Sequence, residues 1–139
     1  EALQTYFLRR YGIPTTYIEN APVAYAQSDS SFGYVHTLGL QPSKYMVFLG
    51  RLVPEKRVDL ILEAFQQLSA QQQTADWKLV LVGNTSDTGQ YTSHLLQLAN
   101  RNPNIIFTGE LQGTRLAEVV RGAGLFVLPS DVEGLPLAL

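Results

Sequence analysis

The chain has 139 residues, of which 45% are apolar, and this fits a single globular core. It contains no cysteine, which excludes disulfides and thiolate metal sites and fits a reducing compartment. The formal net charge is −2, without the basic stripe typical of nucleic-acid-binding proteins, so we expect no nucleic-acid partner. The apolar runs are far shorter than the ~20 residues that cross a bilayer.

The first 43 residues differ in pattern from the rest of the chain. Residues 2–11 have the pattern of a helix, and 15–18 that of a short strand. Residues 19–43 are rich in Ser, Gly, Pro and Ala and show little periodicity. We therefore predict a linker over 19–43.

Four apolar runs alternate with helical patterns over the remaining residues. The runs do not alternate with polar residues, and each is followed by a turn-forming residue; they are 45–49, 78–82, 104–107 and 125–128. Such runs are typical of strands buried on both faces of a parallel sheet. Apolar residues at helical spacing indicate helices around 58–68, 95–99 and 116–123. The alternation predicts an α/β fold with a doubly wound parallel sheet.

In an open α/β sheet, ligands bind at the carboxyl ends of the strands, where the strand order reverses. If 45–49 is the central strand and 125–128 is the fourth, segments 50–56 and 130–136 flank that crevice. The first segment offers Arg51 and Lys56 near a helix start, and these groups suit a diphosphate. The alternative is that both cations are surface charges that pair with Glu55 and Asp59.

The second segment places Glu133 beside Gly134. Glycine lets a ligand approach the backbone, and the carboxylate can accept hydrogen bonds from sugar hydroxyls. The alternative is that Glu133 only stabilises the N-terminus of the next helix. Asp131 and Glu133 lack a third hard ligand at useful spacing, so we expect no metal site. Neither a dinucleotide fingerprint nor a P-loop motif is present in the sequence.

Several segments, in the same order, resemble family 4 glycosyltransferases of the GT-B fold. FLGRLVPEKRVD at 48–59 is similar to the start of the family's C-terminal domain, LVLVG at 79–83 to its second strand and IFTGEL at 106–111 to its third. LPSDVEGLP at 128–136 resembles the opening of the family's E-x7-E motif, and TYIENAPV at 16–23 resembles the strand and hinge between the two domains.

The resemblance implies a Rossmann-like sheet that binds the nucleoside-diphosphate sugar donor of a hexosyltransferase. By matching positions, it places Arg51 and Lys56 on the diphosphate, Glu133, Gly134 and Leu135 at the donor sugar, and Glu110 and Leu111 at the base. It also implies metal-independent transfer without a cofactor, with retention of the anomeric configuration. The acceptor would be a sugar or a lipid-linked glycan, and the enzyme would be cytoplasmic, with the membrane surface as an alternative.

The resemblance assigns 1–43 to the end of an N-terminal domain, a hinge strand and a linker, and 44–139 to the donor-binding domain. Because the second glutamate of the motif would be residue 141, we expect an incomplete half of a GT-B fold, without a complete catalytic centre. The missing N-terminal domain would be its partner. We expect poor burial around Leu3, Phe7 and Leu8 and around 135–139, because both regions would normally pack on parts that are missing. Arg57 stands where the family often has glycine.

A non-catalytic nucleotide-binding or regulatory α/β module is the alternative function. A receiver-type module needs an acidic pair after its first strand, and this chain has Gly50-Arg51 there. The sequence does not name the base, the sugar or the acceptor.

Overall fold

The computed structural model describes residues 2–16, 18, 31–73, 76–84, 89–99 and 101–132. A parallel sheet of four strands, in the order β3-β2-β1-β4, forms its centre. The strands are β1 (Tyr45–Leu49), β2 (Lys78–Val82), β3 (Ile105–Gly109) and β4 (Leu125–Phe126). The helices are α1 (Ala2–Tyr11), α2 (Gly33–Thr37), α3 (Val58–Ala70), α4 (Gly89–Ala99), α5 (Gly113–Gly122) and the 3-10 turn η1 (Pro54–Lys56).

The strand order confirms the predicted doubly wound sheet. From β1 the chain passes through α3 to β2 and through α4 to β3, and then returns through α5 to β4 on the other side of β1. The order therefore reverses between β1 and β4, which is the switch point that the sequence predicts.

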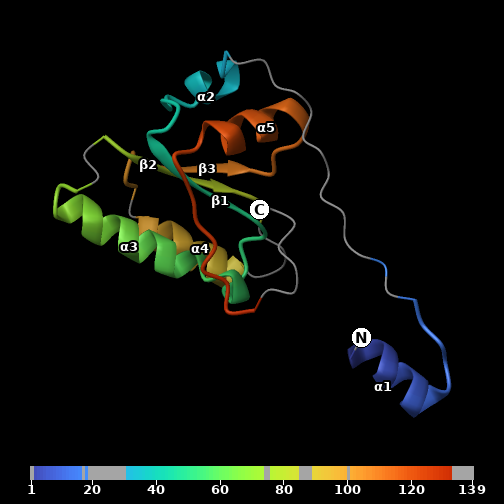
Figure 1. The fold of residues 1–139 in the computed structure, drawn as a ribbon. Helices are drawn as coiled ribbons and strands as arrows, with labels where there is room; N and C mark the ends of the chain where they lie inside the picture. The colour runs from blue at the N-terminus through green and yellow to red at the C-terminus, as the bar shows by residue number, and fades with distance from the viewer. Residues whose placement is uncertain are drawn as a thin grey trace.

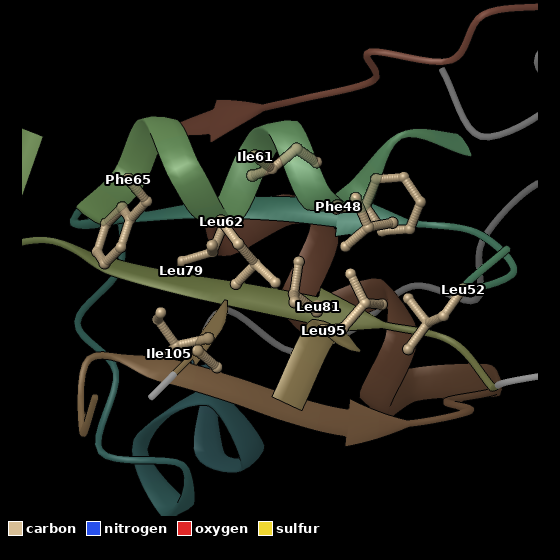
Figure 2. Close-up of a cluster of buried hydrophobic side chains, with 11 residues drawn as sticks. Phe48, Leu52, Ile61, Leu62, Phe65, Leu79, Leu81, Leu95 and Ile105 are labelled. Carbon is tan, nitrogen blue, oxygen red and sulfur yellow. The ribbon is translucent and has the colours of Figure 1, made fainter. Parts of the chain in front are cut away.

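Helices cover both faces of the sheet, α3 and α4 on one side and α2 and α5 on the other (Figure 1). Side chains alternate between these layers, as the pleat of a strand requires. Phe48 on β1 and Leu81 on β2 pack in the cluster under α3 and α4, with Phe65 (Figure 2). Their neighbours Val47 and Val80 pack in the cluster on the opposite face. Both faces of the two central strands are thus buried, which explains why their sequences are apolar without interruption.

Tyr45 fixes the position of α5 against the sheet. Its hydroxyl is buried and donates a 2.7 Å hydrogen bond to the carbonyl of Val119 on α5. Burial, together with the nearby Glu118 carboxylate, raises the pKa of Tyr45. A Cβ on Gly122 would lie 2.6 Å from this hydroxyl, so the helix approaches β1 closely because residue 122 has no side chain.

Two predictions at the N-terminal side are wrong for the described residues. Instead of a linker, residues 33–37 form α2, and Val35 and Leu40 are buried in the core. The sequence shows no helical periodicity here because α2 has only five residues. Such a short helix is stabilised by tertiary packing. Residues 15, 16 and 18 form no strand, since a strand needs a neighbouring strand to accept its hydrogen bonds. The domain boundary at residue 43 stays a prediction.

Helix α1 lies apart from the sheet (Figure 1), and several of its apolar side chains are exposed. Leu3 is 72% exposed, Leu8 55% and Phe7 39%. The prediction of poor burial here is confirmed, whereas the matching prediction for 135–139 lies outside the described residues. Searched over its described residues, the chain has no helix long and apolar enough to cross a membrane.

Candidate functional site

The carboxyl ends of β1 and β2 approach each other unusually closely. Gly83 follows β2 with φ +146°, a conformation that L side chains rarely adopt, and a Cβ built on it would lie 1.9 Å from the carbonyl oxygen of Gly50. The Gly50 amide donates a hydrogen bond to the carbonyl of Val82, and the Leu52 amide donates one to the carbonyl of Asn84. Each of these bonds is 3.0 Å long. The two glycine turns therefore form one surface of exposed backbone, which sequence alone does not reveal.

At the end of β3 the pairing with β2 is interrupted by a β-bulge. Leu81 pairs with Phe107, but Val82 pairs with Gly109, so Thr108 is the additional residue. Beyond the bulge the Gly83 amide donates a 2.9 Å hydrogen bond to the carbonyl of Gly109. Bulges of this kind are frequent beside functional sites, where they redirect the chain that follows.

A pocket of about 460 Å³ opens at this edge of the sheet. It is lined by residues 49–51 at the end of β1, 82–84 at the end of β2, and 110 and 111 after β3. Arg51, predicted from strand topology and from the family resemblance, and Glu110 and Leu111, predicted from the resemblance alone, therefore line one pocket. Leu111 is almost buried and forms its apolar wall, while Arg51 and Glu110 are exposed.

The Arg51 guanidinium makes no hydrogen bond or ion pair with any residue that the structure describes. Of the carboxylates that the alternative reading pairs with Arg51 and Lys56, which are Glu55 and Asp59, Asp59 forms an ion pair with Arg57. Lys56 is half-buried at the end of η1 and is not among the residues that line the pocket. Of the two predicted cations, Arg51 lies at the pocket and Lys56 does not.

The segment after β4 packs against the turn after β1. The Asp131 amide donates a 3.0 Å hydrogen bond to the carbonyl of Glu55. The Asp131 carboxylate lies 3.2 Å from Nη1 of Arg57. The hydroxyl of Ser130 is buried without a hydrogen-bond partner among the described residues. The described part of the predicted segment 130–136, residues 130–132, therefore meets the turn after β1 at the switch point.

Glu133, Gly134 and Leu135 lie outside the described residues. Their predicted place beside Arg51, at the same edge of the sheet, stays a prediction. The last described residue before them is Val132, one position beyond the contact between Asp131 and Glu55.

Arg57 is the functional candidate that sequence reasoning treated only as a departure from the family. Its backbone has φ +50°, a left-handed conformation that suits glycine, which accounts for the family's frequent glycine at this position. The side chain contacts two carboxylates, Asp59 at 3.4 Å and Asp131 at 3.2 Å. The hydrogen bond with Asp131 is the main cause that raises the pKa of Arg57, so the guanidinium stays charged.

Tyr91 on α4 extends this contact network. Its hydroxyl donates a 2.8 Å hydrogen bond to Asp59 and accepts one of 3.3 Å from the Asp59 amide. Burial and the bond to the Asp59 carboxylate raise the pKa of Tyr91 to about 12. Over the part of the chain that is described, no three His, Asp or Glu side chains lie together in a way that could hold a metal ion.

Comparisons with known proteins agree with this architecture. A family model described as glycosyl transferases group 1 matches residues 38–139. A curated relative, a D-inositol 3-phosphate glycosyltransferase of Rhodococcus opacus, is 32% identical over 106 residues, which cover 73% of this chain and 24% of the relative. The chain therefore spans about a quarter of that relative's length.

Two solved structures show the same fold. One is the C-terminal domain of a glycosyl transferase group 1 family protein, LpcC, from Francisella tularensis, with a TM-score of 0.65 and 18% identity over 82% of this chain and 60% of that one. The other is the pneumococcal O-GlcNAc transferase GtfA in complex with UDP and GlcNAc, with a TM-score of 0.65 and 17% identity over 98% of this chain and 24% of that one.

Proposed function

Because this chain belongs to the group 1 glycosyl transferases, we propose that it binds the nucleoside-diphosphate sugar donor of a hexosyltransferase, at the carboxyl edge of its sheet. The observation that carries this proposal is the pocket that brings Arg51, Glu110 and Leu111 together. It combines a cation, hydrogen-bonding groups and an apolar wall, which are the groups that a nucleotide needs.

The strand order favours a linear arrangement of the three parts of such a donor. Glu110 and Leu111 follow β3, Arg51 follows β1, and residues 133–135 come after β4 at the far side. Since neighbouring strands lie about 4.8 Å apart, β3 and β4 are separated by about 14 Å along the edge. We propose that the base lies at β3, the diphosphate at β1 with Arg51 and Lys56, and the sugar beyond β4 with Glu133, Gly134 and Leu135.

The features of Arg51 support its role at the diphosphate. A guanidinium that binds two oxygens in parallel gains from being planar and from having no competing partner in the protein. The Arg51 side chain is exposed at the pocket and makes no hydrogen bond or ion pair with the described residues. As further parts of the proposal, transfer is independent of metal ions and cofactors and retains the anomeric configuration, and the acceptor is a sugar or a lipid-linked glycan.

A thermal-shift panel of nucleoside-diphosphate sugars on the full-length protein tests the function. A ligand at 100 times its Kd stabilises the folded state by about 2.7 kcal/mol, so the true donor should stand out. Product analysis with that donor then separates a transferase from the alternative, a non-catalytic nucleotide-binding module. A protein that responds to no donor in the panel would contradict the proposal.

Calorimetric titration tests the role of Arg51. We expect Arg51→Ala to weaken nucleoside-diphosphate binding about 10- to 150-fold, because a charge-assisted contact contributes about 1.5–3 kcal/mol. Arg51→Lys should recover only part of this, and nucleoside binding should barely change. Lys44→Ala is the matched control, since Lys44 is an exposed cation before β1, at the opposite edge. Equal losses for diphosphate and nucleoside would refute a diphosphate role.

A further inference from the structure

Four side chains form a continuous series of polar contacts from α4 to the segment after β4. The Tyr91 hydroxyl bonds to Asp59, the other oxygen of Asp59 lies 3.4 Å from Nε of Arg57, and Nη1 of Arg57 lies 3.2 Å from Asp131. The series joins two segments that are 74 residues apart in sequence. It lies outside the pocket, whose lining residues it does not include.

Arg57 is the residue on which this series depends. Nε and Nη1 are different edges of one rigid guanidinium, so contact with Asp59 at the start of α3 fixes where Asp131 is held. Asp131 is also held by its backbone amide, which donates to Glu55. Two independent contacts therefore attach this segment to the turn after β1, only two residues before Glu133.

The backbone at Arg57 gives a second reason to assign it a role. With φ +50°, the position would accept glycine without strain, and η1 and α3 would keep their geometry. Arginine at this position therefore gives the fold no backbone advantage. What it adds is the bridge between the two carboxylates.

We propose that Arg57 is a positioning residue that, through Asp131, holds the segment after β4 against the turn that carries Arg51, and so sets the spacing of the two segments across which the donor binds. The proposal rests on the proposed function, because it needs a donor that spans both segments. Asp131 is the partner through which Arg57 acts, and Tyr91 and Asp59 hold the guanidinium in place.

The test is the pair of variants Arg57→Gly and Asp131→Asn in the full-length enzyme. Arg57→Gly should fold at least as well as wild type, because glycine suits the left-handed backbone. We expect its affinity for nucleoside diphosphate to stay within about twofold of wild type, while kcat with the sugar donor falls about fivefold, the scale of one exposed ion pair. The double variant should lose no more than the worse single variant, since both remove one interaction.

Gln72→Gly is the matched control, because Gln72 also has a left-handed backbone, φ +58°, but lies beyond the end of α3. Its kcat should match wild type. Wild-type kcat in Arg57→Gly, additive losses in the double variant, or an equal fall of diphosphate affinity and kcat would each overturn the positioning role. None of these results touches the proposed function, which fails separately if the wild-type protein binds no nucleotide sugar.

Discussion

Gly83→Ala is the substitution whose effect follows most directly from the structure. The new Cβ would lie 1.9 Å from the carbonyl oxygen of Gly50, whereas real Cβ atoms essentially never come within 3.0 Å of another atom. One of the two backbone turns must therefore move by more than an ångström. No side chain can absorb the clash, because the obstructing atom belongs to the backbone of Gly50.

The expected cost has two parts. A residue other than glycine at φ +146° costs about 1–3 kcal/mol in backbone strain. The displaced packing adds about 1–3 kcal/mol, as for other over-packed sites. The total, about 2–6 kcal/mol, is a large share of the 5–15 kcal/mol that stabilises a typical domain. The hydrogen bond from Gly50 to Val82 is the contact most exposed to this movement.

Urea unfolding and calorimetric titration of the full-length protein measure both consequences. We expect a lower unfolding midpoint and, in any folded protein, a loss of about 10- to 150-fold in nucleoside-diphosphate affinity, which is the scale of the charge-assisted contact of Arg51, the residue after Gly50. Gly89→Ala is the control, because its Cβ would meet nothing within 4 Å. A Gly83→Ala protein with wild-type stability and wild-type affinity would refute this account of the site.

Three further predictions concern the core, the pH dependence and the chain alone. Phe65→Ala should lower the free energy of unfolding by about 3–5 kcal/mol, because Phe65 is only 1% exposed; a loss below 1 kcal/mol by urea unfolding would contradict its place in the core. The pKa of Tyr91 is raised from 10.0 to about 12, so its neutral form stabilises the fold fully below pH 10, and this contribution is lost as the pH rises toward 12. Tyr91→Phe should therefore lessen the alkaline fall of the denaturation midpoint, and an unchanged slope would speak against the shift. Finally, residues 1–139 alone should transfer no sugar from any donor; measurable product would overturn the expected division of labour between domains.

The central strands and long helices could be predicted because local pattern and tertiary environment agree there. β1 and β2 are buried on both faces, so the apolar runs at 45–49 and 78–82 mark them fully. β4 is shorter than its run, Leu125–Phe126 against the predicted 125–128, because it lies at the sheet edge and pairs only with Met46 and Val47. The run at 104–107 is displaced to Ile105–Gly109 by the bulge.

The site could be predicted only where it depends on strand ends. Arg51, Glu110 and Leu111 follow strands directly, so a correct topology places them at one edge. The role of Arg57 could not be predicted, because its left-handed backbone and its contact with Asp131, 74 residues away, exist only in the folded chain. The close approach of Gly83 to Gly50 escapes prediction for the same reason.

The bulge at Thr108 interrupts the alternation of side chains between the two faces of the sheet. In β3, Ile105 and Phe107 face the layer of α3 and α4, while Ile106 faces the layer of α2 and α5. Under strict alternation Leu111, another odd-numbered residue, would face α3 and α4, yet it packs with the opposite cluster. The additional residue and the left-handed turn at Gly109, φ +71°, precede Leu111, which packs in this other layer and forms the apolar wall of the pocket.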